Sequence, residues 1–316
     1  MELNMLTEKQ PITITVMQRL KRDFHRNKLK YLMVLPVIIY FLVFAYRPMY
    51  GLVIAFKDFK PHIGIADSPW VGFANFTRFF NDPSAFRVVK NTFMISFWSI
   101  LFGFPAPILL ALMINEIRNK AFKRVVQTVT YIPYFISLVV ICSLIKTFTQ
   151  SDGLISDFLV GLGFERMNLL ATKAFFIPIY VISGIWQTVG WDSIIYLAAL
   201  SGIDQEQYEA ARIDGAGRIK QMIHITIPGI RPTIIILFIL RMGSLLNVGF
   251  EKILLLYSPS TYEVADVIST FVYRMGILNA DYSYSTAIGL FNTLVNVCLL
   301  LITNKIARKT TQSGLF

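Results

Sequence analysis

Residues 208–228 read YEAARIDGAGRIKQMIHITIP, a polar stretch between two long apolar segments. Asp204 lies just ahead of it and can cap a helix, with Gln207 three residues later completing a capping box. We expect this helix to run to about Asp214. There Gly215 supplies the permissive backbone that a sharp stop requires.

The second half of the stretch predicts another short helix, ended by Pro228 and Pro232. Its helical spacing places four apolar residues on one face: Ile219, Met222, Ile223 and Ile227. A helix, a glycine turn and a helix of this kind are too polar for lipid and too apolar on one side for water. The stretch therefore predicts a surface that binds a protein partner.

The composition indicates a polytopic membrane protein. Of 316 residues, 55% are hydrophobic and 16% charged, and the mean hydropathy is +0.57. The net charge of +11 lies at the edges of apolar segments, which argues against a nucleic-acid partner. Six segments are near the length that a bilayer requires. They lie at about 31–56, 91–115, 125–145, 174–200, 232–256 and 282–304, with a kink expected at Pro105 and Pro107.

The distribution of Lys and Arg predicts the orientation. With the N-terminus inside, the inner segments hold 18 basic residues and the outer ones nine. We therefore expect a multi-pass, all-α membrane protein with both termini in the cytoplasm. Its parts would be a basic arm (1–30) on anionic lipid, a six-helix domain (31–306) whose loop 201–231 is cytoplasmic, and a tail (307–316).

The spacing of the polar stretch resembles the EAA loop of binding-protein-dependent ABC importer permeases. The family pattern has EAA, three residues, G, nine residues, I, one residue, L and P. It is matched here except that Ile227 replaces the leucine. A packed amphipathic loop is the alternative to this resemblance. The resemblance implies that these residues couple to an ATPase: Tyr208, Glu209, Ala210, Ala211, Asp214, Gly215, Ala216, Gly217, Ile225 and Pro228.

Other segments resemble the polysaccharide branch of these permeases, whose members include subunits for uronate oligosaccharides such as alginate fragments. They are residues 48–51 (PMYG), 55–59 (AFKDF), 68–72 (SPWVG), 75–76 (NF) and 190–200 (GWDSIIYLAAL). The outer segment 52–90 is aromatic. It can be an interfacial belt or a docking surface for an extracytoplasmic partner.

The family resemblance implies a type I ABC importer permease of the bacterial cytoplasmic (inner) membrane that moves an oligosaccharide by alternating access. Its partners would be a second permease, two ABC ATPase subunits and an extracytoplasmic solute-binding protein. No Gly-Lys dipeptide occurs in the sequence, so a P-loop is excluded, and ATP and Mg²⁺ would bind the partner ATPase. The three histidines are too scattered for a metal site. An ion-coupled secondary transporter or a membrane-embedded enzyme remains the alternative function.

Polar residues inside the apolar segments are candidates for the substrate path, because hydrocarbon excludes them from lipid-facing positions. Interhelical hydrogen bonding is the alternative role. Asp192 and Arg241 should lie at the same depth on consecutive spans, about 12–14 Å from the inner boundary, and form an ion pair. The candidates are Trp186, Gln187, Trp191, Asp192, Asn247, Glu251, Asn292 and Asn296.

Overall fold

The computed structural model describes residues 16–311 and 314–315, which form two compact units divided after Val53. Outside the described residues lie the first part of the predicted arm (1–15) and three residues of the predicted tail (312, 313 and 316). The first unit contains α1 (Val16–Phe41), a π-helical turn, α2 (Arg47–Met49) and the start of a 3₁₀-helix at Tyr50. The π-helical turn ends at Tyr46, two residues before Pro48. Apolar side chains from Leu32 to Phe44 are exposed, as a lipid-facing helix requires.

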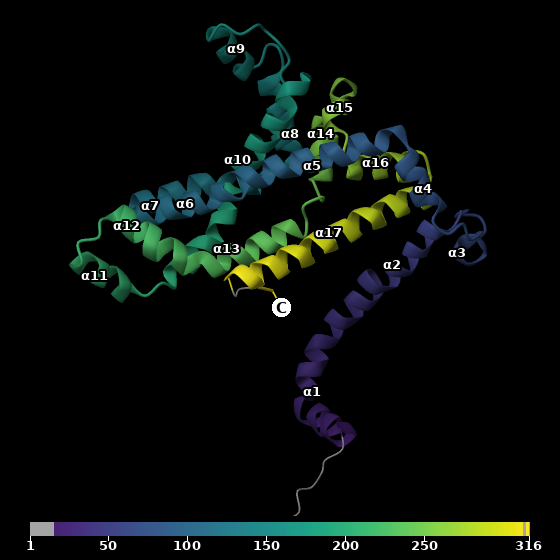
Figure 1. The fold of residues 1–316 in the computed structure, drawn as a ribbon, viewed down its shortest axis with the longest axis horizontal. Helices are drawn as coiled ribbons and strands as arrows, with labels where there is room; N and C mark the ends of the chain where they lie inside the picture. Colours follow the sequence, from purple (N-terminus) through teal and green to yellow (C-terminus); the bar gives the residue numbers. More distant parts are fainter. Residues whose placement is uncertain (1–15, 312–313, 316) are drawn as a thin grey trace, which may run out of the picture. The chain divides into compact units, whose positions relative to one another are not determined.

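The second unit is a bundle of long helices around α10 (Lys173–Ser201). Helix α10 packs against α5 (Pro83–Gly103) and α6 (Pro105–Glu116) on one side and α13 (Ile227–Met242) on another. Helix α17 (Tyr282–Thr311) runs beside α13 (Figure 1). The boundary between α5 and α6 lies at Phe104, directly before the two prolines that predicted a kink.

Three buried clusters hold the bundle together. One joins α8 (Leu138–Thr149), α10 and α14 (Phe250–Leu256) around Phe176 and Ile253. A second packs Phe79, Phe271 and Tyr284. The third joins α6, α10 and α13 through residues such as Leu200 and Ile230. In a membrane, close packing of these side chains and interhelical hydrogen bonds stabilise the bundle, because apolar side chains gain little by leaving hydrocarbon.

Shorter helices complete the unit. They are α3 (Gly64–Asp67), α4 (Ala74–Asn81), α7 (Lys120–Tyr131), α9 (Leu154–Gly161), α11 (Gln205–Ile213), α12 (Arg218–Gln221), α15 (Tyr262–Ala265) and α16 (Ile268–Tyr273). Among the described residues, six helical segments are long and apolar enough to cross a membrane: Arg22–Phe56, Pro83–Glu116, Leu138–Gly161, Lys173–Ser201, Arg218–Met242 and Tyr282–Thr311. The predicted all-α class with six spans is therefore confirmed.

Two predicted spans have the wrong boundaries. The segment 125–145 is broken near Pro133, where a 3₁₀ turn (Ile132–Phe135) separates α7 from α8. The segment 232–256 is broken after Met242, and its helix begins earlier, at Arg218. Hydropathy averaged over a window does not register such breaks, because the interrupting residues are themselves mostly apolar.

Candidate functional sites: the elbow and the central cavity

The polar stretch folds as two helices joined at a glycine; we call residues 204–228 the elbow. Asp204 caps α11 by accepting a hydrogen bond from the backbone N–H of Glu206 at 3.0 Å. The predicted capping box is wrong, because no bond from Gln207 back to Asp204 is present among the described residues. The cap still satisfies one of the free N–H groups at the start of the helix.

Gly215 ends α11 with a φ of +75°, in the left-handed region. The N–H of Gly215 donates to the carbonyl of Arg212 at 3.0 Å, and that of Ala216 donates to the carbonyl of Ala211 at 2.8 Å. These two bonds form a Schellman motif, which satisfies carbonyls at the helix end. A side chain at Gly215 would meet no atom within 4 Å, so the requirement for glycine here comes from the backbone.

The second arm of the elbow does not end at its prolines. Gly217 precedes α12, which continues through a π-helical turn (Met222–Thr226) into α13. Pro228 lies two residues after the end of the π-helical turn, whose wider backbone accommodates the proline ring without ending the helix. The expectation that Pro228 and Pro232 end the helix is therefore wrong, and the elbow continues directly into a long helix of the bundle.

The tip of the elbow exposes isoleucines. Ile213 is 87% exposed, Ile219 69% and Ile223 52%. Met222, predicted on the same face, instead packs with Ile225 against the third cluster. The second arm therefore has two apolar faces. One packs against the bundle, and the other is exposed.

Two polar contacts hold the two arms of the elbow together. The hydroxyls of Tyr208 and Thr226 lie 3.0 Å apart and link the two arms. The side-chain amide of Gln221 donates to the carbonyl of Ala216 at 2.7 Å, across the turn. Glu209 and Asp214 are exposed, and neither carboxylate has an ion-pair partner among the described residues. Ala210 is also exposed and Ala211 is half-buried, so Glu209 and Ala210 face away from the core.

A cavity of 520 Å³ lies within the bundle, lined by α5, α6, α10, α13 and α14. We call it the central cavity. Its charged lining residues are Asp192, Arg241 and Lys252, and Gln187 and Asn247 also line it. Such a volume is typical of a site that binds a small ligand.

Asn247 connects the central cavity to α17. Its side-chain oxygen accepts hydrogen bonds from the amides of Asn292 and Asn296, each at 3.1 Å. The oxygen of Asn296 in turn accepts from the backbone N–H of Leu246 at 3.0 Å. Asn292 and Asn296 therefore hold Asn247 in place rather than lining the cavity themselves.

Besides Asn292 and Asn296, three predicted path residues lie outside the cavity lining: Trp186, Trp191 and Glu251. Trp191 stacks on Tyr134 with ring centroids 4.5 Å apart and meets Phe135 edge-on. Trp186 and Glu251 are exposed. The predicted ion pair between Asp192 and Arg241 is wrong. Both residues line the cavity, but in the described structure no carboxylate oxygen of Asp192 lies within 4.0 Å of a guanidinium nitrogen of Arg241.

A charged cluster that was not predicted from the sequence lies at the end of the bundle opposite the elbow. Asp266 is 0% exposed and accepts two hydrogen bonds from the guanidinium of Arg274, at 2.7 and 3.2 Å. Thr270 donates to the same carboxylate at 2.9 Å, and a nitrogen of Arg87 lies 3.6 Å away. Asn91 donates to the backbone carbonyl of Asp266 at 3.0 Å.

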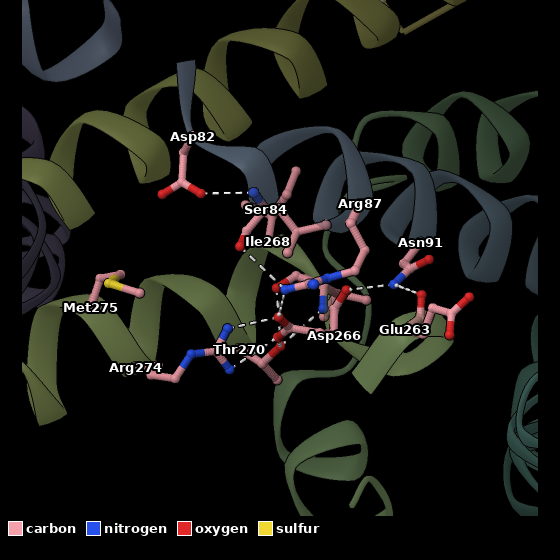
Figure 2. Close-up of polar contacts among 12 residues, drawn as sticks. Asp82, Ser84, Arg87, Asn91, Glu263, Asp266, Ile268, Thr270, Arg274 and Met275 are labelled. Atoms are coloured by element: carbon pink, nitrogen blue, oxygen red, sulfur yellow. Dashed lines mark hydrogen bonds and ion pairs between the residues drawn. The ribbon is translucent and has the colours of Figure 1, made fainter. Parts of the chain in front are cut away.

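We call these five residues the Asp266 cluster. Figure 2 shows Arg87 and Asn91 reaching from α5 toward Asp266 and Arg274. Burial lowers the pKa of Arg274, but the hydrogen bonds and charge of Asp266 outweigh it and leave the pKa raised. The signal in the sequence was an aspartate directly between apolar neighbours, Ala265 and Val267, with an arginine eight residues later.

The elbow and the bundle match a known family. The model described as "Binding-protein-dependent transport system inner membrane component" matches residues 103–312, which include the elbow, α10, α13 and α17. The chain belongs to this family. It is a permease subunit of an ATP-driven ABC importer, with the type I importer fold, and a multi-pass membrane protein. Membership therefore favours the importer over the secondary transporter and the membrane enzyme.

Relatives match over nearly the whole permease. Protein LplB of Bacillus subtilis (strain 168) is 47% identical, over 96% of this chain and 94% of the relative. The polygalacturonan/rhamnogalacturonan transport system permease protein YteP of the same organism is 44% identical, over 95% and 94%. A solved bacterial alginate ABC transporter, in complex with a periplasmic protein bound to an alginate pentasaccharide, has a chain with a TM-score of 0.87. That chain is 45% identical, over 94% of this permease and all of its own length.

Proposed function

We propose that this permease imports an acidic oligosaccharide of the uronate type. A second permease, two ABC ATPases that bind ATP and Mg²⁺, and an extracytoplasmic binding protein would complete the importer. Two relatives of this permease carry names of acidic polysaccharide systems, polygalacturonan/rhamnogalacturonan and alginate. The central cavity supports the same substrate class, because two cationic side chains and one carboxylate line it.

The elbow is the ATPase docking site in this proposal, and its exposed isoleucines carry the assignment. Ile213, Ile219 and Ile223 lie on a polar loop, where uncovered apolar side chains indicate a protein partner. Because α12 continues through a π-helical turn into α13, a movement of the docked elbow is transmitted to a helix that lines the cavity. This continuity provides the mechanical link that alternating access requires.

Purification of the tagged chain from native membranes tests the assembly. We expect a P-loop ATPase and a second permease in stoichiometric amounts. In proteoliposomes, ATP and the binding protein should drive uptake of a uronate oligosaccharide. A chain that purifies without an ATPase, or a complex that takes up no oligosaccharide, would contradict the proposal.

Accessibility to a membrane-impermeant thiol reagent tests the orientation. In this proposal the elbow and both termini are cytoplasmic, whereas exposed Thr77 on α4 lies outside. A cysteine at Thr77 should react in intact cells. A cysteine at exposed Lys220 in the elbow should react only after the inner face is opened. Reaction at Lys220 in intact cells would reverse the orientation and exclude ATPase docking at the elbow.

A further inference from the structure

Lys252 is a buried cation in the central cavity, with no acidic partner in the part of the chain that the structure describes. Its side chain comes from α14, and the residue is 6% exposed. The ammonium donates one hydrogen bond, to the backbone carbonyl of Tyr180 at 3.0 Å. It also lies 4.8 Å from the centroid of the Tyr180 ring. No carboxylate lies within 4.0 Å of the ammonium among the described residues.

The contacts of Lys252 leave donors available. A protonated lysine has three N–H donors, and among the described residues only one of them has an acceptor. A buried charge without a counter-ion is costly, so it requires a compensating interaction. The other buried charge, Asp266, is compensated by Arg274, Arg87 and Thr270 from the chain itself. The compensating group for Lys252 is therefore to be sought outside the chain.

The surroundings of Lys252 define what that group is. The central cavity has a volume of 520 Å³, enough for part of an oligosaccharide. Arg241 adds a second positive charge to the lining, while Asp192 is its one carboxylate. Asn247 brings an amide held by Asn292 and Asn296. Cations together with an oriented amide suit a ligand that carries both carboxylate and hydroxyl groups.

We infer that Lys252 binds a carboxylate of the transported sugar and gives this permease its preference for acidic over neutral oligosaccharides. Arg241 contributes a second positive charge, and the Asn247 amide binds sugar hydroxyls. The inference rests on the proposed function, which names the substrate class. It identifies Lys252 as the residue that distinguishes an acidic sugar from a neutral one.

Equilibrium binding to the purified permease–ATPase complex tests this role without the binding protein, whose own preference would mask it. The probes are a galacturonate trisaccharide and an alginate trisaccharide, each compared with its methyl ester. The ester keeps the rings and removes the charge. We expect the wild-type complex to bind at least one acid more tightly than its ester by about ten- to hundredfold, as one charged hydrogen bond provides.

Lys252→Met should abolish this preference by weakening binding of the acid more than binding of the ester, whereas Lys252→Arg should retain part of it. Lys90→Met provides the matched control, because Lys90 is an exposed lysine on α5 outside the cavity lining. Co-elution with the ATPase and an unchanged melting temperature establish that each variant is folded.

A Lys252→Met complex that keeps the preference would overturn the inference, as would a wild-type complex without one. The proposed function is measured separately, by uptake of the same sugars into proteoliposomes. If uptake proceeds while Lys252→Met retains the preference, only the inference fails. If no oligosaccharide is taken up, both fail.

Discussion

The Asp266 cluster and the elbow lie at opposite ends of the bundle (Figure 1) and differ in how their side chains are satisfied. Asp266 is buried and has its charge and hydrogen-bond partners within the chain. At the elbow, Glu209 has no ion-pair partner among the described residues, and Ile213 and Ile219 are exposed. The comparison supports a stabilising role for the first region, and for the second the proposal that it binds another subunit.

Removal of the buried carboxylate should produce the largest effect. Asp266→Ala leaves Arg274 three-quarters buried without its partner. We expect a loss of about 3–5 kcal/mol in the free energy of unfolding, because the remaining charge is uncompensated. The double variant Asp266→Leu with Arg274→Met should recover most of it. The melting temperature of the purified chain measures both.

Asp58→Asn is the control for this prediction, since Asp58 forms an exposed pair with Lys60 at 3.7 Å and contributes little. A melting temperature unchanged by Asp266→Ala would show that the cluster is not a stabilising element.

A charge on the exposed elbow should have an intermediate effect, on association rather than stability. Ile219→Asp places a carboxylate in the proposed ATPase interface, where burial without a partner is costly. We expect at least a tenfold weaker affinity for the ATPase, with an unchanged melting temperature. Leu162→Asp is the control, because Leu162 is similarly exposed near α9, far from the elbow. Equal ATPase affinity for wild type and Ile219→Asp would exclude this face from the interface.

The smallest effect is expected at an exposed ion pair. Lys173 donates a hydrogen bond to Glu263, which lowers the pKa of that carboxyl from its ordinary value of 4.5. A lowered pKa stabilises the folded state above the ordinary value, and this contribution is lost as the pH falls through the folded-state pKa. Both groups are exposed, so Lys173→Met should barely change the melting temperature at neutral pH.

The same variant should raise the pKa of Glu263 toward 4.5, measured by titration of a labelled glutamate. A melting temperature that falls by several degrees at neutral pH would show that this pair, like the Asp266 cluster, contributes substantially to the free energy of unfolding.

The elbow could be predicted from the sequence because its determinants are local. The Asp204 cap and the Gly215 turn lie within a dozen residues of each other. The Asp266 cluster could not, since Asn91 and Asp266 are 175 residues apart and become neighbours only when α5 packs beside α16. The central cavity was predicted in part. Gln187, Asp192 and Asn247 line it, whereas Lys252, which also lines it, was not among the predicted path residues.

The coupling role of the elbow is the central claim, and ATPase activity of the reconstituted complex tests it most directly. Gly215→Asp should cost only about 1–2 kcal/mol of stability, from the left-handed backbone alone, because open space surrounds the position. Glu209→Ala should be a milder variant, which loses one charged contact with the ATPase. Gly163→Asp is the matched control, with a φ of +93° and open surroundings, in the loop after α9.

With sugar and binding protein present, we expect stimulated ATPase activity to be lost in Gly215→Asp, reduced in Glu209→Ala and retained in Gly163→Asp. All three complexes should remain inserted in the membrane. Full stimulated activity in Gly215→Asp would contradict the account, because the elbow could then not be the element that couples ATP hydrolysis to transport.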